Sequence, residues 1–237
     1  MLSGKKTQTK KMFNWLVDLL DKAEKNNEIV YILNHLGLNA GFMMTECAKR
    51  FQALFDRYEY NIRGIFSGHT HKDDVELISG YFDNSRYVAL NFIGPSLTTN
   101  PNVVPSYRIY EIGSKTYNIY DYEQYRFDLN KSNKEEIPYW YLSHKAIDLF
   151  KVKDMTEYKL IGELDDYSEY ILKRYQDADW IKKHVKEESY IRKAKCIIHS
   201  NNYIDYEKCS GSKVGLNAYT LSLFSNYLID PFTEGDE

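Results

Sequence analysis

Two histidines separated by one residue have the clearest capacity for chemistry in this sequence. His69 and His71 lie in the segment Gly-His-Thr-His at 68–71, directly after a short apolar run. A glycine lets a chain turn tightly after a strand, and neutral imidazole is a good ligand for zinc and other transition ions. His35 follows an earlier apolar run in the same way. We therefore expect His35, His69 and His71 to converge as metal ligands.

The elements that must position these histidines are expected to be a strand, a helix and a strand. The β-branched run 29–33 predicts a buried strand that ends just before His35, and the run 62–66 predicts a second strand. Between them, apolar residues recur at helical spacing over 45–58. A βαβ unit brings the carboxyl ends of its strands to one edge of the sheet, where open α/β sheets bind ligands. Both histidine loops should therefore lie at that edge.

The rest of the chain is expected to add antiparallel strands and helices. Four strand-like runs, separated by turn residues, predict an antiparallel extension of the sheet; they are 75–78, 87–93, 107–112 and 117–120. A polar stretch that resembles a linker follows at 130–138. Three stretches beyond it show helical spacing; they are 140–150, 160–175 and 178–194. The predicted fold class is α/β, with a sheet-containing part over 1–135 and a helical region over 136–237.

The remaining histidines and the cysteines give weaker signals. Three histidines have no partners at ligand spacing, and we expect ordinary surface or core roles for them; they are His144, His184 and His199. Cys47 lies on the inward face of a predicted helix, which indicates a buried thiol. Cys196 and Cys209 could form a disulfide or remain two reduced thiols, and the sequence leaves both readings open.

Composition and charge argue against some classes of protein. Among 237 residues, 31 are Lys or Arg and 34 are Asp or Glu, for a formal net charge of −3. Nucleic-acid binders usually present a basic face, so we expect no nucleic-acid binding. No apolar run approaches the ~18–20 residues that span a bilayer. We also expect no secretory signal, because the polar residues 1–11 lack an apolar segment behind them.

Several ordered motifs make the chain resemble the acid-sphingomyelinase-like phosphodiesterases of the calcineurin-like metallophosphoesterase superfamily. The motifs are the Gly-His-Thr-His segment with its neighbours at 67–74, Gly-Pro-Ser-Leu-Thr-Thr at 94–99 and Ser-Tyr-Arg-Ile-Tyr-Glu-Ile at 106–112. The residues Asn-His-Leu-Gly at 34–37 fall where the family has a Gly-His-x-Pro-Pro-Gly loop. The resemblance runs from about residue 12 to residue 112 and is weaker through the helical tail.

This resemblance implies a metallophosphoesterase sandwich, in which stacked sheets flanked by helices hold two metal ions at the sheet ends. It implies that His35 and His69 bind one Zn²⁺ and that His71 binds the other. The implied reaction is hydrolysis of a phosphodiester, such as a phospholipid head group or a nucleotide, by a metal-bound hydroxide. An extracellular or lysosomal location is also implied, and the sequon at 130–132 would permit glycosylation there.

The sequence also departs from the family pattern. The family's Asp-x-His, Gly-Asp-x-x-Asp and Gly-Asn-His motifs come before the matching region, where this chain has only a short polar lead. Two divalent ions ~3.5–4 Å apart need anionic ligands, and we interpret Asp73 and Asp74 as surface or capping carboxylates. We therefore expect at most one zinc ion. We also expect an open apolar edge beside the strand 29–33, available to a missing N-terminal half or to another chain.

Two functions fit these observations. The first is a metal-dependent phosphodiester hydrolase that resembles acid sphingomyelinase, present as an incomplete catalytic half that is inactive alone. The alternative is a non-catalytic remnant that binds a partner chain or a single metal ion. The family's aspartate motifs upstream in the parent gene would discriminate between them.

Overall fold

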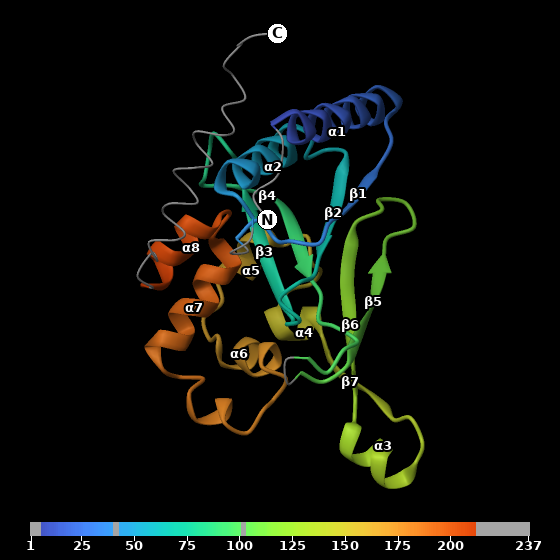
Figure 1. The fold of residues 1–237 in the computed structure, drawn as a ribbon, viewed down its shortest axis with the longest axis vertical. Coiled ribbons are helices and arrows are strands. Elements are labelled where there is room, and N and C mark those ends of the chain that lie inside the picture. Colours follow the sequence, from blue (N-terminus) through green and yellow to red (C-terminus); the bar gives the residue numbers. More distant parts are fainter. Residues whose placement is uncertain (1–5, 40–42, 101–102, 212–237) are drawn as a thin grey trace.

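The computed structural model describes residues 6–39, 43–100 and 103–211, in which two β-sheets are flanked by helices (Figure 1). The strands are β1 (Val30–Leu33), β2 (Ile62–Ser67), β3 (Asp74–Ser79), β4 (Tyr87–Ile93), β5 (Ser106–Ile112), β6 (Ile119–Phe127) and β7 (Trp140–Lys145). The helices are α1 (Lys6–Asn26), α2 (Thr45–Arg57), α3 (Leu129–Glu135), α4 (Ala146–Phe150), α5 (Tyr158–Gly162), α6 (Ser168–Arg174), the 3-10 helix η1 (Ile181–Lys183), α7 (Glu188–His199) and α8 (Tyr203–Ser210).

The first sheet contains the expected strand, helix and strand. Its order is β1-β2-β4-β3, with β1, β2 and β4 parallel and β3 antiparallel to β4. Helix α2 connects β1 to β2, and Leu33 at the end of β1 pairs with Phe66 of β2. The loops that follow these two strands therefore start side by side.

Contrary to expectation, the runs 107–112 and 117–120 contribute to β5 and β6 of a second, separate sheet rather than extending the first. This second sheet consists of β5, β6 and β7 in antiparallel order. The runs 75–78 and 87–93 form β3 and β4, which extend the first sheet and pair antiparallel with each other as expected, but β4 also pairs parallel with β2. Strand β4 lies between β2 and β3 and is buried on both faces, which its largely apolar sequence allows.

The segment 140–150 is helical only in part, and the expectation of a helix over its whole length is wrong. Its first six residues form β7, and α4 begins at Ala146. Aromatic side chains favour a strand where they can pair across a sheet, and Trp140 packs on Phe127 with ring centroids 5.0 Å apart. The polar stretch 130–138 contains most of α3 and connects the paired strands β6 and β7.

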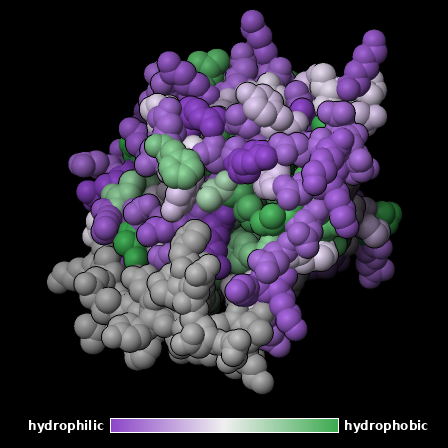
Figure 2. Space-filling view, turned by 90° about the horizontal axis from the view of Figure 1, so that it is seen from above, coloured by the Kyte–Doolittle hydropathy of each residue, from purple (hydrophilic) through white to green (hydrophobic). Residues whose placement is uncertain are grey.

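Apolar side chains form clusters on both faces of the first sheet. One cluster joins the sheet to α1 and α2 and includes Leu20, Phe55 and Ile65. The other joins both sheets to the C-terminal helices and includes Phe92 of β4 and Ile171 of α6. The C-terminal helices therefore share one core with the sheets. Seen from above α1 and α2, the surface is mostly hydrophilic with separate apolar patches (Figure 2).

The cysteines and the helix lengths bear on two further expectations. A disulfide joins Cys196 of α7 to Cys209 of α8, and Cys47 of α2 is a buried free thiol. Among the helices of the described residues, none has the length and apolar character needed to cross a bilayer.

Candidate metal centre and its surroundings

The loops after β1 and β2 bring His35 and His69 into contact. Nε2 of His35 lies 3.0 Å from Nδ1 of His69, and the two rings meet edge to face with centroids 4.9 Å apart. The backbone fixes this approach, because the Gly68 N–H donates to the His35 carbonyl at 3.1 Å. His35 is exposed, so the pair is accessible to solvent.

His71 contacts a different group. Its Nδ1 lies 2.6 Å from the carbonyl oxygen of Asn100. A carbonyl oxygen only accepts, so Nδ1 carries the proton and Nε2 of the neutral ring keeps its lone pair. Metal-binding histidines commonly show this arrangement. Within residues 6–39, 43–100 and 103–211, no three His, Cys, Asp or Glu side chains form a group that could hold a metal ion. The structure thus unites His35 with His69 and leaves His71 outside that pair.

The segment that carries His69 and His71 is a tight and unusual turn. Their φ angles are 70° and 57°, in the left-handed region that residues with a Cβ seldom adopt. The Thr70 N–H donates to the Gly68 carbonyl at 2.8 Å, which closes the turn locally. Residues in such conformations persist where the surrounding structure holds them. The contacts at both ends of this turn should therefore help to hold His69 and His71 in their left-handed conformations.

A buried carboxylate, that of Glu76 in β3, supports the loop that carries His35. Its Oε1 accepts from the Asn39 N–H at 2.8 Å, and its Oε2 accepts from the Leu38 N–H at 3.0 Å and from Asn91 Nδ2 at 2.8 Å. Burial raises the pKa of Glu76 to about 7, because desolvation of the charged form outweighs the effect of these donors.

The same network reaches the second histidine loop. Ser67 Oγ lies 2.6 Å from Oδ1 of Asn34 and 2.8 Å from Oδ1 of Asn91. Asn34 immediately precedes His35, and Ser67 ends the strand that leads to the Gly-His-Thr-His turn. One continuous set of polar contacts therefore links Glu76 to the first residues of both loops.

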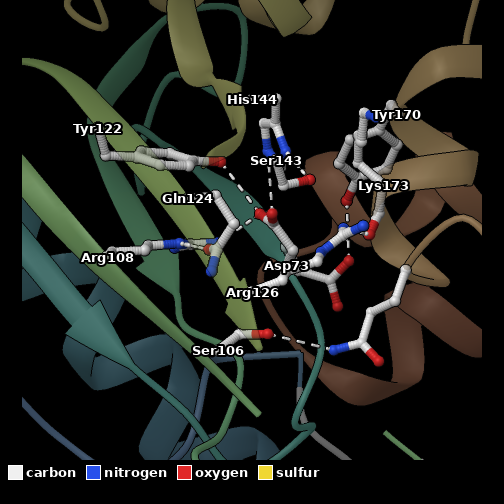
Figure 3. A network of polar contacts seen from close by, with 12 residues as sticks. Asp73, Ser106, Arg108, Tyr122, Gln124, Arg126, Ser143, His144, Tyr170 and Lys173 are labelled. Atoms are coloured by element: carbon white, nitrogen blue, oxygen red, sulfur yellow. Dashed lines mark hydrogen bonds and ion pairs between the residues drawn. The ribbon is translucent and has the colours of Figure 1, made fainter. Parts of the chain in front are cut away.

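Asp73 and Asp74 are buried, so their interpretation as surface or capping carboxylates is wrong; their exposed fractions are 3% and 2%. Asp73 forms an ion pair with Arg108 of β5, accepts from the Tyr122 hydroxyl of β6 at 3.0 Å, and lies 3.0 Å from His144 Nε2 of β7 (Figure 3). Burial alone would raise the pKa of Asp73, but Arg108 and His144 outweigh it and hold that pKa well below its usual range.

Asp74 turns to the helical region instead. Its Oδ1 accepts from Arg174 Nε at 2.6 Å and from the Tyr170 hydroxyl at 2.9 Å, and both partners belong to α6. Burial works against the charge of Arg174, but the Asp74 carboxylate outweighs it and raises the pKa of the guanidinium. Helix α6 is thereby bound to the strand that starts just after the histidine turn.

Sequence reasoning did not find the roles of Asp73, Glu76 and His144. A signal existed in the second sheet, where Arg108 and Arg126 occupy the inward positions of β5 and β6. A charged side chain on the inward-facing side of a strand needs a buried partner of opposite sign. That rule could have indicated that carboxylates elsewhere in the chain are buried.

Comparisons with curated proteins give a consistent result, although no family model matches the chain. Sphingomyelin phosphodiesterase 2 of Caenorhabditis elegans is 32% identical over 151 residues, which cover 60% of this chain and 24% of that protein. Sphingomyelin phosphodiesterase B of Dictyostelium discoideum is 25% identical over 232 residues, which cover 86% of this chain and 36% of that protein. The human cyclic GMP-AMP phosphodiesterase SMPDL3A is 25% identical over 170 residues, which cover 66% of this chain and 37% of that protein.

The chain is a distant homologue of the sphingomyelin phosphodiesterases and the acid-sphingomyelinase-like phosphodiesterases. It spans only about a quarter to just over a third of the length of the relatives named above. The match to the Dictyostelium sphingomyelin phosphodiesterase covers 86% of the chain, so wherever it begins, it must extend into the C-terminal helices. The homology therefore includes part of the helical region as well as the strands.

Proposed function

We propose that this chain supplies the histidine ligands of a metal-dependent phosphodiester hydrolase site and that the metal is zinc. The homology to phosphodiesterases supports the reaction class, and the 3.0 Å contact of His35 Nε2 with His69 Nδ1 carries the assignment of ligands. Two nitrogens bound to one tetrahedral zinc lie roughly 3.3 Å apart, given Zn–N distances near 2.0–2.1 Å. To bind one ion, the rings must turn so that both lone pairs face it, and the proton shared by the two nitrogens must move to the other nitrogen of its ring.

His71 is assigned to a second metal position in this proposal. Its ring faces the Asn100 carbonyl through Nδ1, which leaves Nε2 as the nitrogen that can bind a metal. This division agrees with the resemblance, which separates His71 from the pair of His35 and His69. Zinc at such a site polarises a phosphoryl oxygen and lowers the pKa of water. The contribution of this chain is to hold the imidazoles in place through the network of Glu76.

The carboxylates next to the histidine turn are unsuited to complete a two-metal site. Asp73 is paired with Arg108 and Asp74 with Arg174, so their charges already have buried partners. Two divalent ions need anionic ligands between them. We therefore propose that the chain alone holds at most one zinc ion and hydrolyses phosphodiesters poorly or not at all.

The substrate class and the location are proposed from the homology. Relatives named for sphingomyelin and for cyclic GMP-AMP support a phospholipid head group or a nucleotide-like phosphodiester as substrate. The disulfide of Cys196 and Cys209 suits an oxidising compartment, which supports an extracellular or lysosomal location. Asn130 of the sequon is exposed, so it is accessible to glycosylation.

Zinc stoichiometry and affinity of the purified chain test the ligand assignment. We expect about one zinc ion per chain by elemental analysis. His35→Ala and His69→Ala should each weaken binding at least tenfold, because each removes a metal ligand. His184→Ala is the matched control, because His184 is half-exposed and contacts Glu187 rather than another histidine. Unchanged zinc affinity in both loop variants would rule out the assignment.

Turnover of a chromogenic phosphodiester, bis(p-nitrophenyl) phosphate, tests the second part of the proposal. With zinc present, the chain alone should give little or no turnover above the His35→Ala variant. Robust zinc-dependent turnover that is lost in His35→Ala would show that the chain carries a complete site.

A second candidate function is a non-catalytic module that binds a partner chain or one metal ion. The edge position of β1 favours it, because β1 is a terminal strand of its sheet in the described part of the chain and Leu33 is 80% exposed. An open edge offers N–H and C=O groups to a strand of another chain. Zinc binding without turnover, together with self-association or partner binding that Leu33→Lys abolishes, would support this role.

A further inference from the structure

We propose that Asp73 and Asp74 are positioning residues that hold the histidine turn, residues 68–72, from its C-terminal end. The inference rests on the proposed function only for what the turn does, since the contacts themselves need no metal. Asp73 follows the turn directly, and Asp74 is the first residue of β3. The two carboxylates reach partners in different parts of the molecule, and each anchors the same short segment.

The Asp73 contact is rigid because its partners are themselves fixed. Figure 3 shows Asp73 facing Arg108, Tyr122 and His144, which come from the three strands of the second sheet. The guanidinium of Arg108 lies over the Tyr122 ring at 4.2 Å, and its Nε donates to Gln124 Oε1 at 2.8 Å. All these groups are buried, so water competes little for the carboxylate. Asp73 therefore ties the end of the turn to the whole second sheet.

The Asp74 contact ties the same point to α6, through Arg174 and Tyr170. Lys72, the residue before Asp73, adds a third attachment, because its ammonium lies 4.7 Å from the centre of the Tyr175 ring. Three consecutive residues thus leave the turn toward separate partners. Such attachments can hold the left-handed conformations of His69 and His71, which the local sequence does not favour.

The competing explanation is that these ion pairs only hold the sheet and the helices together. A matched pair exists for this comparison. Arg126 of β6 is buried, and its Nη1 lies 2.5 Å from Oδ2 of Asp177, just after α6. Its Nη2 donates to the Lys173 carbonyl at 2.6 Å. Loss of the Asp177 carboxylate removes a similar link between the second sheet and the helical region without touching the turn.

Amide hydrogen exchange distinguishes the two explanations. The variants are Asp73→Asn, Asp74→Asn and the control Asp177→Asn, each measured in the full chain without metal. The readout is the exchange rate of the Gly68 and Thr70 amides divided by that of the β4 amides, so that a general loss of stability cancels. We expect this ratio to rise at least tenfold in Asp73→Asn and Asp74→Asn and to stay within twofold in the control.

Equal ratios in all three variants would overturn the inference. Asp73→Asn leaves Arg108 buried without a counter-ion, so that variant can fail to fold. The double variant Asp73→Asn/Arg108→Gln removes both charges and can be tested in the same way. Its exchange ratio should also rise at least tenfold, and a ratio equal to that of the control would overturn the inference. Zinc affinity gives a second readout, expected to fall at least tenfold in the Asp73 and Asp74 variants only. A wild-type chain that binds no zinc would contradict the proposed function, while the exchange ratios would still decide the positioning role.

Discussion

At the scale of single residues, Glu76 shows how a buried charge can serve a loop. Three N–H donors converge on its carboxylate, and two of them belong to the backbone just after His35. These donors partly offset the cost of burial, yet desolvation still raises its pKa to about 7 from an ordinary value of 4.5. The protonation state of Glu76 therefore depends on folding in the range between these two values.

The stability of the chain should depend on pH through Glu76. The folded state keeps the Glu76 proton up to about pH 7, whereas the unfolded state releases it near pH 4.5. Between these values the folded state binds more protons, so the free energy of unfolding falls as pH rises and then levels off. The loss should be about 3 kcal/mol at most. Urea unfolding of wild type and Glu76→Gln across this range measures it, because the variant has no carboxyl group to titrate. A stability difference that does not change with pH would contradict the prediction.

At the scale of elements, the last two helices of the described part depend on a covalent link. Helix α8 has eight residues, a length at which an isolated helix is marginal in water. Three residues separate it from α7, and the disulfide of Cys196 and Cys209 joins the two helices across a sequence separation of 13. The position of α8 should therefore be more sensitive to reduction than the position of any strand.

Reduction of the disulfide should lower the free energy of unfolding by about 3 kcal/mol, as expected for a closed loop of this length. Urea unfolding with and without a thiol reductant measures the change. Cys209→Ala should be destabilised to a similar degree and should no longer respond to the reductant. Cys47→Ala is the control that should keep the full response, because Cys47 is a buried free thiol outside the disulfide. A wild-type chain of equal stability in both conditions would contradict this prediction.

At the scale of the whole molecule, the helical region and the sheets are bound by shared core and polar contacts. The larger apolar cluster includes Phe92 and Tyr122 from the two sheets together with Ile171 and Ile198 from the helices. The ion pair of Asp74 with Arg174 crosses the same interface. Strand β7 also begins at residue 140 and needs β6 as its partner. The helical region thus lacks most of its surroundings when it is separated from the strands.

Residues 139–237 expressed alone should therefore not fold as an independent unit. The fragment loses the apolar surfaces of β3, β4 and β6 and leaves its buried tyrosines exposed. Thermal melting followed by near-UV circular dichroism tests this, with the full chain as the control. A cooperative transition with native-like near-UV dichroism from the fragment would show that the region folds by itself, and the division near residue 135 would then be a true domain boundary.

The sequence by itself determined the part of the site that depends on local pattern. Short β-branched runs, a helical period between them and the residues after each run were enough to predict the parallel pair of β1 and β2 with a histidine loop after each. The contact of His35 with His69 follows from that pairing, because parallel strands bring their carboxyl ends together. The family motifs also came from the sequence, and the homologues confirm the resemblance.

Only the tertiary structure decided which strands share a sheet and which charges are buried. Periodicity describes one segment at a time, so it could not place β5 and β6 in a sheet separate from the first or show that Trp140 pairs with Phe127. The partners of Asp73 and Asp74 are 35 and 100 residues away along the chain. Two adjacent carboxylates look like surface groups until distant arginines surround them. Burial of a charge depends on those distant groups, because desolvation is offset only by partners that the fold brings within contact.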